Sequence, residues 1–332
     1  MRRYNVAVVG ATGVVGRKMT EILQERNIPV ENFYPMASKR SAGQKIEFGG
    51  REWTVEELTE SSFDKDIDFA LFSAGGETSL KFAPVAAAKG VIVIDNSSAW
   101  RMDENVPLIV PEVNADSALS HNNIIANPNC STIQALVALK PIYDAYGINR
   151  IVYSTYQSVS GSGIKGISDL KEGISGGAND FYPKQIAYNC IPHIDVFNEN
   201  GYTKEEMKMI NETHKIFNDS SIRITATCVR VPVFYSHSES INIQTDKAFD
   251  IGDIKDILNR ADGVTVIDDI ESALYPTALD AAGSDEVYVG RIRRDFSVDN
   301  GLNLWVVADN LRKGAATNTV QIAEYLINSN AV

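Results

Sequence analysis

The chain has few cysteines and histidines, and neither residue type is arranged as a metal site requires. Its three cysteines, Cys130, Cys190 and Cys228, are spread over 332 residues and form no CxxC spacing. A disulfide framework and a zinc ribbon are therefore excluded. Cysteines that cannot all pair are typical of a reducing compartment. We expect a cytoplasmic protein that binds no metal.

Basic blocks and long apolar runs are also absent. The chain carries 31 Lys and Arg residues against 43 Asp and Glu residues, which gives a net charge of −12. Such an acidic balance argues against binding to nucleic acid or to anionic membranes. No apolar stretch approaches the length of about 18 residues that a membrane-spanning helix needs. The start, MRRYNVAVVG, is typical of a first strand and not of a signal peptide.

The first part of the chain alternates strand and helix patterns. Apolar runs, such as residues 5–9 and 91–95, are separated by segments with helical apolar spacing, such as residues 13–26. Strands that are apolar throughout are buried on both faces, and their alternation with helices indicates a parallel sheet. The sequence therefore predicts an α/β, doubly wound (Rossmann-type) domain of the kind that binds dinucleotides.

The second part of the chain has a different pattern, with long alternating strands. The last two expected strands flank Asp299-Asn300-Gly301, which is a hairpin turn signal. The pattern predicts an α+β domain with a mixed, largely antiparallel sheet and helices on one face. The expected strands are residues 150–158, 221–233, 238–245, 286–294 and 302–308, and the expected helices are residues 204–217 and 253–260.

These two patterns predict two domains, which agrees with a typical domain size of roughly 150 residues. Residues 1–129 and a returning last helix in residues 314–332 are expected to form the dinucleotide-binding domain. Residues 130–313 are expected to form a catalytic and dimerisation domain. A sheet with helices on one face leaves its second face to cover, and a homodimer is the simplest cover.

Three glycines lie between the first strand and the first helix, with the spacing GxxGxxG (residues 10–16). Glycine lets the backbone turn tightly and approach a pyrophosphate, and the helix N terminus supplies N–H groups and a partial positive charge. An ordinary strand–helix turn is the alternative. The expected cofactor contacts in this loop are Gly10, Thr12, Gly13, Val14 and Val15.

The residues after the second strand indicate which dinucleotide is bound. Residues 38–41 (SKRS) contain no carboxylate that would bind a free ribose 2′-hydroxyl. Arg40 and Ser41 suit a 2′-phosphate, which favours NADP over NAD, although a solvated basic turn is the alternative. Ser73 and Gly75 follow another strand and are expected at the same edge of the sheet, where a helix-entry turn would explain them almost as well.

Cys130 differs from the other two cysteines in its position. The segment NPNCST (residues 127–132) follows a strand and opens a helix, so Cys130 is expected where the helix dipole is positive. This position favours a thiolate, which attacks an acyl carbon and then leaves readily. Cys190 and Cys228 lie in apolar segments and are expected to be buried structural cysteines.

Such a nucleophile needs an acid–base partner, and the chain offers four histidines. His214 falls on a charged helix and is expected to face solvent, and His121 lies in a polar turn. His237 lies between two strands, and His193 follows a proline. The spacing of the residues does not decide between His237 and His193.

Five segments together resemble the aspartate-semialdehyde dehydrogenase family. They are GATGVVG, NPNCST, YQSVSGSG, EEMK and RVPVFYSHSES, and they occur in the family's order over nearly the whole chain. The shorter bacterial branch is the most similar. The resemblance implies reduction of L-aspartyl 4-phosphate by NADPH to L-aspartate 4-semialdehyde, with release of phosphate. This reaction serves the synthesis of lysine, threonine, methionine, isoleucine and diaminopimelate.

The resemblance also implies the catalytic roles. Cys130 would be the nucleophile that forms a thioester, His237 the acid/base and Gln157 the residue that orients the acyl-enzyme. Backbone N–H groups at the start of the Cys130 helix are expected to hold the oxyanion. The positions that the resemblance places near the nicotinamide are Ser160, Gly161 and Asn310.

The implied substrate contacts match the charges of the substrate. Arg230 would hold the α-carboxylate and Glu205 the ammonium, while Arg101 and Lys208 would bind phosphate. Arginine grips such anions through paired hydrogen bonds, and lysine adds a point charge. Without the resemblance, Glu205 and Lys208 would be interpreted as a surface salt bridge. Asn129 is also expected at the substrate.

One residue departs from the family pattern, and two other functions remain possible. Trp100 stands where a phenylalanine is expected before Arg101.

N-acetylglutamyl-phosphate reductase shares the fold plan and the cysteine chemistry, but its substrate has no free ammonium and needs no Glu205. A non-catalytic NADP-binding sensor is the other alternative.

Overall fold

The structure is a computed structural model that describes residues 2–329 and 331–332. The chain forms two compact units. Unit 1 contains the residues up to Pro128 and those from Ala315 onward, and unit 2 contains Asn129–Gly314. None of the described helices is both long enough and apolar enough to cross a membrane.

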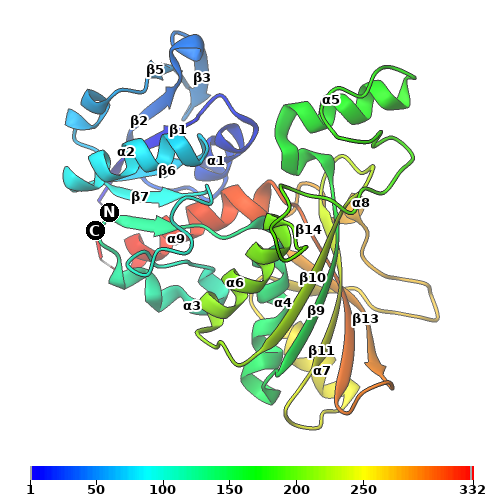
Figure 1. The fold of residues 1–332 in the computed structure, drawn as a ribbon. Coiled ribbons are helices and arrows are strands. Elements are labelled where there is room, and N and C mark those ends of the chain that lie inside the picture. The colour runs from blue at the N-terminus through cyan, green and yellow to red at the C-terminus, as the bar shows by residue number, and fades with distance from the viewer. Residues whose placement is uncertain (1, 330) are drawn as a thin grey trace. The chain divides into compact units, whose positions relative to one another are not determined.

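Unit 1 is built on a six-stranded sheet with the order β5-β2-β1-β6-β7-β8, in which all neighbouring strands are parallel (Figure 1). The central strands β1 and β6 are buried except at Asn5, as their apolar runs predict. The Rossmann-type sheet is therefore confirmed. The strands are β1 (Tyr4–Val9), β2 (Val30–Ala37), β5 (Glu56–Glu57), β6 (Phe69–Phe72), β7 (Ile92–Asp95) and β8 (Ile124–Ala126).

The remaining elements of unit 1 include some that the sequence did not predict. A small hairpin, β3 (Lys45–Phe48) and β4 (Arg51–Thr54), forms a separate two-stranded sheet. The last helix begins at Thr317 and not at residue 314, because residues 312–316 form a π-helical turn before it. The α-helices of unit 1 are α1 (Val14–Glu25), α2 (Gly76–Ala88), α3 (Pro111–Asn114) and α9 (Thr317–Asn328).

The strand order of unit 1 reverses at β1, which has β2 on one side and β6 on the other. Ligands of doubly wound sheets bind outside the carboxyl ends of the strands at such a switch point. Gly10 follows β1 and Ser73 follows β6, and a Cβ atom added to Gly10 would lie only 2.5 Å from the Ser73 carbonyl oxygen. The glycine loop therefore lies at the switch point.

Unit 2 contains a six-stranded mixed sheet with the order β10-β9-β11-β14-β13-β12 (Figure 1). Its three central pairs are antiparallel and its two outer pairs are parallel, so the predicted mixed sheet is confirmed. The strands are β9 (Arg150–Gln157), β10 (Arg223–Arg230), β11 (His237–Gln244), β12 (Val264–Val266), β13 (Val287–Asp295) and β14 (Gly301–Ala308).

The helices α4, α6 and α7 pack on this sheet. The α6 helix occupies the predicted residues because a capping box closes its start: the Thr203 N–H donates to Glu206 Oε2 over 2.7 Å, and the Glu206 N–H donates to Thr203 Oγ1 over 3.3 Å. The helix α5, which begins at Gly163, was not predicted. The α-helices of unit 2 are α4 (Cys130–Tyr146), α5 (Gly163–Ile174), α6 (Lys204–Phe217), α7 (Ile251–Asn259) and α8 (Ala278–Ala281).

The strand registers bring several predicted site residues to one end of the unit 2 sheet. Gln157 and Arg230 are paired at the ends of β9 and β10. His237 opens β11 and lies opposite Ala308, which ends β14. Side chains that are far apart in the sequence thus meet at this end of the sheet.

Candidate active site

Cys130 is the first residue of α4 and is partly buried. The preceding residue, Asn129, caps the helix, and its Oδ1 accepts hydrogen bonds from the N–H groups of Ser131 (3.0 Å) and Thr132 (3.4 Å). Such a cap places Cys130 in the first turn, at the positive end of the helix dipole. The Asn129 side chain therefore occupies the N–H groups of Ser131 and Thr132. That backbone N–H groups at the helix start hold an oxyanion stays a prediction.

A second segment approaches Cys130 very closely. Gly314 lies in the π-helical turn of residues 312–316, and a Cβ atom added there would be 2.9 Å from the Cys130 Cβ. Only glycine fits at this distance. Gly314 was not predicted from the sequence, although it belongs to the same VADNLRKG segment as Asn310.

His237 is completely buried, and its tautomer is defined by its neighbours. The backbone N–H of Ser158 donates to His237 Nδ1 over 3.0 Å. Nδ1 is therefore an acceptor, and the proton of the neutral imidazole lies on Nε2. Nε2 has no hydrogen-bond partner among the described residues. His237 thus presents an unused N–H donor, which sequence reasoning did not predict.

Burial, and then the positive charge of Arg230, lower the pKa of His237 to about 3. The imidazole is therefore neutral at physiological pH. Gly161 leaves room for this pair, because a Cβ atom there would lie 3.1 Å from Arg230 Nη1 and 3.3 Å from His237 Nε2. Gly161 is therefore next to His237 and Arg230.

The Arg230 guanidinium has a hydrogen-bond donor that no described residue uses. It is buried, and its Nη1 donates to the Ser158 carbonyl oxygen over 2.7 Å. Its Nε has no acceptor among the described residues. A buried guanidinium with an unused donor is suited to bind the carboxylate of a ligand.

Glu205 is hydrogen-bonded to three other predicted substrate residues. Its Oε1 accepts hydrogen bonds from Asn129 Nδ2 (2.8 Å) and Gln157 Nε2 (3.0 Å), and its Oε2 accepts one from Lys208 Nζ (2.9 Å). Glu205 is only 5% exposed, so its salt bridge with Lys208 is not the surface pair that the alternative interpretation expected. Burial alone would raise the pKa of Glu205, but Lys208, Gln157 and Asn129 together lower it to about 2.

Lys208 is shared between two carboxylates, because its Nζ also donates to Asp195 Oδ2 over 2.9 Å. Burial lowers the pKa of Lys208, but Glu205 and Asp195 reverse this effect and raise it. Both Glu205 and Lys208 are therefore ionised. One anion and one cation lie side by side, as recognition of a zwitterionic ligand requires.

Asn310 and Ser160, which were expected near the cofactor, are connected to the histidine. The Oδ1 atom of Asn310 accepts hydrogen bonds from Ser158 Oγ (3.0 Å), Ser160 Oγ (3.1 Å) and the Ser236 N–H (3.0 Å). All four residues are buried. This network positions Ser158 and Ser236, and through them His237. Sequence reasoning missed Ser158, although it lies within the YQSVSGSG segment.

Arg101 lies in unit 1 and is oriented by main-chain carbonyl groups. Its Nε donates to the Asn127 oxygen over 2.9 Å, and its Nη2 donates to the Asn96 oxygen over 3.0 Å. The neighbouring Trp100 donates through its indole Nε1 to Ser79 Oγ over 3.0 Å. A phenylalanine would not form this bond, so the departure at Trp100 adds a link between this loop and α2.

The loop predicted to bind a dinucleotide has the backbone geometry for it. A Cβ atom on Gly16 would lie 2.2 Å from the Gly10 carbonyl oxygen, so only glycine permits this turn. Gly13 precedes α1 and has no side chain to cap the helix, whose N–H groups point out of its start. The cradle around Gly10, Gly13 and Gly16 fits a pyrophosphate.

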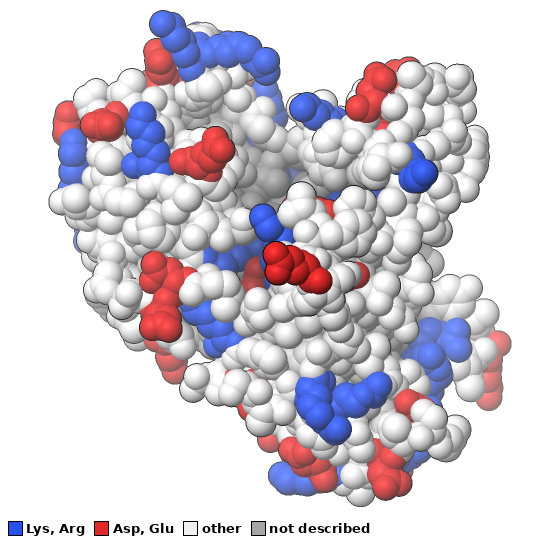
Figure 2. Space-filling model, viewed as in Figure 1, with Lys and Arg blue, Asp and Glu red and all other residues white. Residues whose placement is uncertain are grey.

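Lys39 and Arg40 form a short 3-10 turn after β2, and both are exposed. Figure 2 shows basic side chains gathered over the part of unit 1 that carries β3 and β5. Elsewhere on that face, acidic and basic side chains are interspersed. Lys45 and Arg51, which belong to β3 and β4, are also exposed. Positive charge is therefore concentrated locally, beside the end of β2.

The other two cysteines and two of the other histidines lie in surroundings of their own. Cys228 is buried, as expected, but Cys190 is exposed, so the expectation that Cys190 is buried is wrong. His193 stacks on Phe197 with 4.3 Å between ring centroids. His214 is half-buried and bonded to the Ile222 oxygen over 2.8 Å, and so does not simply face solvent. Among the described residues, no group of three or more His, Cys, Asp and Glu side chains could hold a metal ion.

A Rossmann-type unit with a glycine cradle, followed by a unit with a helix-capped cysteine and a buried histidine, defines a class of dehydrogenases that act through a cysteine. Two family descriptions match the chain: "Semialdehyde dehydrogenase, NAD binding domain" at residues 5–121 and "Semialdehyde dehydrogenase, dimerisation domain" at residues 139–313. Unit 1 therefore contains a nicotinamide dinucleotide-binding domain.

Similar proteins narrow this class. An aspartate-semialdehyde dehydrogenase of Aquifex aeolicus is 56% identical over 98% of both chains, and one of Bacillus subtilis is 51% identical over 100% of this chain and 99% of that one. The crystal structure of Vibrio cholerae aspartate semialdehyde dehydrogenase II complexed with ASA has a TM-score of 0.94 at 51% identity and covers 99% of both chains. The chain belongs to the aspartate-semialdehyde dehydrogenase family, and it is an oxidoreductase of amino-acid biosynthesis.

Proposed function

We propose that the protein interconverts L-aspartyl 4-phosphate and L-aspartate 4-semialdehyde with release or uptake of phosphate, through a thioester on Cys130. The observation that carries this proposal is that buried Glu205, half-buried Lys208 and buried Arg230 lie in the same unit as Cys130 and His237. These three residues offer one anion and two cations to a ligand. An ammonium, a carboxylate and a phosphate are the charged groups that such an acyl phosphate carries.

The chemistry follows from the positions of Cys130 and His237. The Cys130 thiolate attacks the acyl carbon, and the bond from that carbon to the phosphate oxygen breaks, which leaves a thioester. Lys208 is proposed to bind the departing phosphate, and Arg101 is proposed as a further phosphate ligand. Gln157, whose side chain is held by Glu205, orients the acyl group. The bound nicotinamide supplies the hydride.

His237 acts on the reacting oxygen in the second half of the reaction. Hydride addition to the thioester places negative charge on the former carbonyl oxygen, and the Nε2–H of His237 donates a hydrogen bond that shares its proton with that oxygen as the charge develops. When the carbon–sulfur bond breaks, the aldehyde forms, Cys130 leaves as a thiolate and the proton stays on Nε2. The expected donors at the helix start are replaced in this account by His237, because Asn129 occupies two of those N–H groups.

The function is tested by phosphate-dependent reduction of NADP. With aspartate 4-semialdehyde, phosphate and NADP, we expect NADPH to accumulate, and omission of phosphate should abolish the rate. N-acetylglutamate semialdehyde, which has no free ammonium for Glu205, is the matched control and should be a poor substrate. Equal rates with both aldehydes, or a rate that does not depend on phosphate, would contradict the proposal.

We infer that NADP is preferred over NAD. The loop after β2 carries Lys39, Arg40 and Ser41 and no carboxylate. A 2′-phosphate would gain charge-assisted hydrogen bonds from Arg40, whereas a free 2′-hydroxyl would gain little. The cofactor residues in this loop and at Ser73 and Gly75 serve the same dinucleotide.

Arg40→Ala is expected to lower the ratio of kcat/KM for NADP to that for NAD by roughly 10- to 100-fold, the effect of losing a charge-assisted hydrogen bond. Steady-state kinetics with both cofactors measure the ratio. Arg51→Ala removes another exposed cation of unit 1 and is the control. An unchanged ratio in Arg40→Ala would refute the assignment of this residue.

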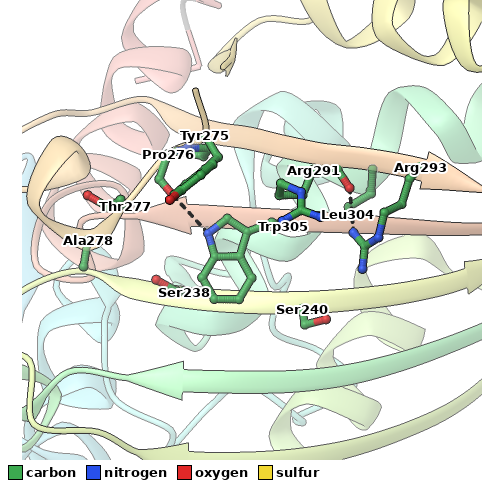
Figure 3. Close-up of a pocket in the computed structure, with 10 residues that line it drawn as sticks. All are labelled: Ser238, Ser240, Tyr275, Pro276, Thr277, Ala278, Arg291, Arg293, Leu304 and Trp305. Carbon is green, nitrogen blue, oxygen red and sulfur yellow. Dashed lines mark hydrogen bonds between the residues drawn. The ribbon is translucent and has the colours of Figure 1, made fainter. Parts of the chain in front are cut away.

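We also infer that two copies pair through the open face of the unit 2 sheet. Tyr156 on β9 is 39% exposed, and its ring lies 5.6 Å from that of Trp305 on β14. A pocket of about 350 Å³ lies on this face. The Trp305 indole donates there to the Pro276 oxygen over 3.0 Å (Figure 3). Exposed aromatic side chains beside a pocket are typical interface anchors.

Tyr156→Asp places a charge on this face and is expected to weaken the dimer by roughly 30-fold or more, the effect of about 2 kcal/mol at an interface anchor. Sedimentation at micromolar concentration should show a shift toward the monomer. Asn259→Asp adds the same charge on the exposed part of α7 and should leave the dimer intact. A wild-type protein that sediments as a monomer would contradict the proposed homodimer.

A further inference from the structure

A buried carboxyl group lies beneath the start of α4, and the steps proposed above do not use it. Glu239 lies in β11 two residues after His237, so the two side chains leave the strand on the same side. The Glu239 side chain is completely buried. It faces Ser131 and Gln134, which lie in the first two turns of the helix that begins at Cys130.

The polar atoms at this place lack ordinary partners. Ser131 Oγ, Gln134 Oε1 and both carboxyl oxygens of Glu239 are buried with no hydrogen-bond partner at normal distance among the described residues. The amide nitrogen of Gln134 donates to the main-chain oxygen of His237 over 3.3 Å. Gln134 Oε1 therefore needs a donor. A carboxylate offers none, whereas a protonated carboxyl group has an O–H.

The charges around Glu239 also favour the protonated form. The titratable groups that act on it are Glu205 of α6, Tyr153 of β9 and Cys228 of β10. Each of these is anionic or neutral, so they give a carboxylate no compensating charge. Burial raises the pKa of Glu239 well above its usual value, and the negative charge of Glu205 adds to the effect. Gln134 and Ser131 oppose this only in part.

We propose that Glu239 is a positioning residue: as a neutral carboxylic acid it donates a hydrogen bond to Gln134, which in turn holds the main chain of His237. Gln134 lies four residues after Cys130, on the same face of α4. The relay therefore connects the helix of the nucleophile to the strand of the acid–base residue. It rests on the roles proposed above for Cys130 and His237.

The protonation state is tested by thermal unfolding, which does not depend on catalysis. In the unfolded chain Glu239 loses its proton above about pH 4.5, its ordinary pKa, while the folded protein keeps it. The wild type therefore loses stability relative to Glu239→Gln as the pH rises above that value. We expect the difference in Tm between Glu239→Gln and the wild type to grow from pH 4.5 to pH 8. A difference that stays constant or shrinks over this range would show that Glu239 is ionised.

The positioning role is tested by kinetics with three variants. Glu239→Leu cannot donate to Gln134, and its kcat is expected to fall by roughly 10- to 100-fold, as small misplacements of reacting groups do, with KM nearly unchanged. Glu239→Gln keeps both a donor and an acceptor and should restore kcat. Ile241→Val, a truncation of a completely buried side chain on the same strand, controls for loss of packing.

Two outcomes would overturn the positioning role: a kcat for Glu239→Leu equal to that of Ile241→Val, or a kcat for Glu239→Gln as low as that of Glu239→Leu. Failure of the proposed mechanism would look different. It would be seen as turnover retained in Cys130→Ser, with the pH dependence of the Tm difference unaffected.

Discussion

Cys130→Ser is expected to lose turnover by roughly 10⁴- to 10⁶-fold, the range found when a nucleophile or its partner is removed from a catalytic unit. The serine hydroxyl has nearly the shape of the thiol, so the contact with Gly314 and the Asn129 cap should survive. A hydroxyl remains protonated where a thiol ionises, and the attack on the acyl carbon fails. Initial rates of phosphate-dependent NADPH formation measure the loss.

The exposed Cys190 provides both the control and a complication for this experiment. Cys190→Ser should keep wild-type turnover, because Cys190 lies outside the contacts described for the site. Alkylation of Cys130 should be followed in the Cys190→Ser background, since an exposed thiol would otherwise also be labelled. We expect labelling to inactivate the enzyme and aspartate semialdehyde to protect it. A Cys130→Ser variant with near wild-type activity would rule out the thioester.

Much of the fold was predictable because the signals for it are local. The β13–β14 hairpin follows from a turn signal between two alternating strands. The predicted bounds of α6 are correct because apolar spacing and a cap act within the same segment. The helix α5 begins at Gly163, which has a φ of +69°, and a glycine in that conformation gives no helical signal. The π-helical turn of residues 312–316 likewise has no periodicity of its own.

The site was less predictable than the fold, because its decisive contacts join residues that are far apart in the chain. Spacing left His193 and His237 as equal candidates. The Ser158 N–H that orients His237 lies 79 residues away from it in the chain. A contact within one segment was also not predicted. The Asn129 side chain folds back onto its own helix, and residue type alone does not reveal which N–H groups such a cap occupies.

His237→Asn is expected to lower kcat by roughly 10²- to 10⁴-fold, the usual contribution of general acid–base catalysis, with little change in KM. The asparagine Oδ1 can take the place of Nδ1 as acceptor for the Ser158 N–H, so the fold around the residue is kept. What is lost is the Nε2–H that faces the reacting oxygen. Initial rates of phosphate-dependent NADPH formation from aspartate semialdehyde measure the loss.

His237→Gln separates hydrogen bonding from proton transfer. Its longer side chain brings an amide N–H close to the position of the imidazole Nε2, but an amide does not exchange a proton during turnover. We therefore expect Gln to recover part of the loss seen with Asn if stabilisation of the oxyanion matters, and nothing if only proton transfer matters. Wild-type rates in both variants would remove His237 from the mechanism.

The pH dependence provides a further check on His237, because its pKa is lowered to about 3. The unfolded chain takes up a proton at His237 below its ordinary pKa of about 6.5, and the folded protein does not until much lower pH. Wild-type stability therefore declines as the pH falls from about 6.5, and His237→Asn should decline less steeply over that interval. Chemical unfolding at a series of pH values measures this. Parallel curves for the two proteins would mean that His237 is not held neutral in the folded protein. The donor to the reacting oxygen would then be an imidazolium beside Arg230 and not a neutral imidazole.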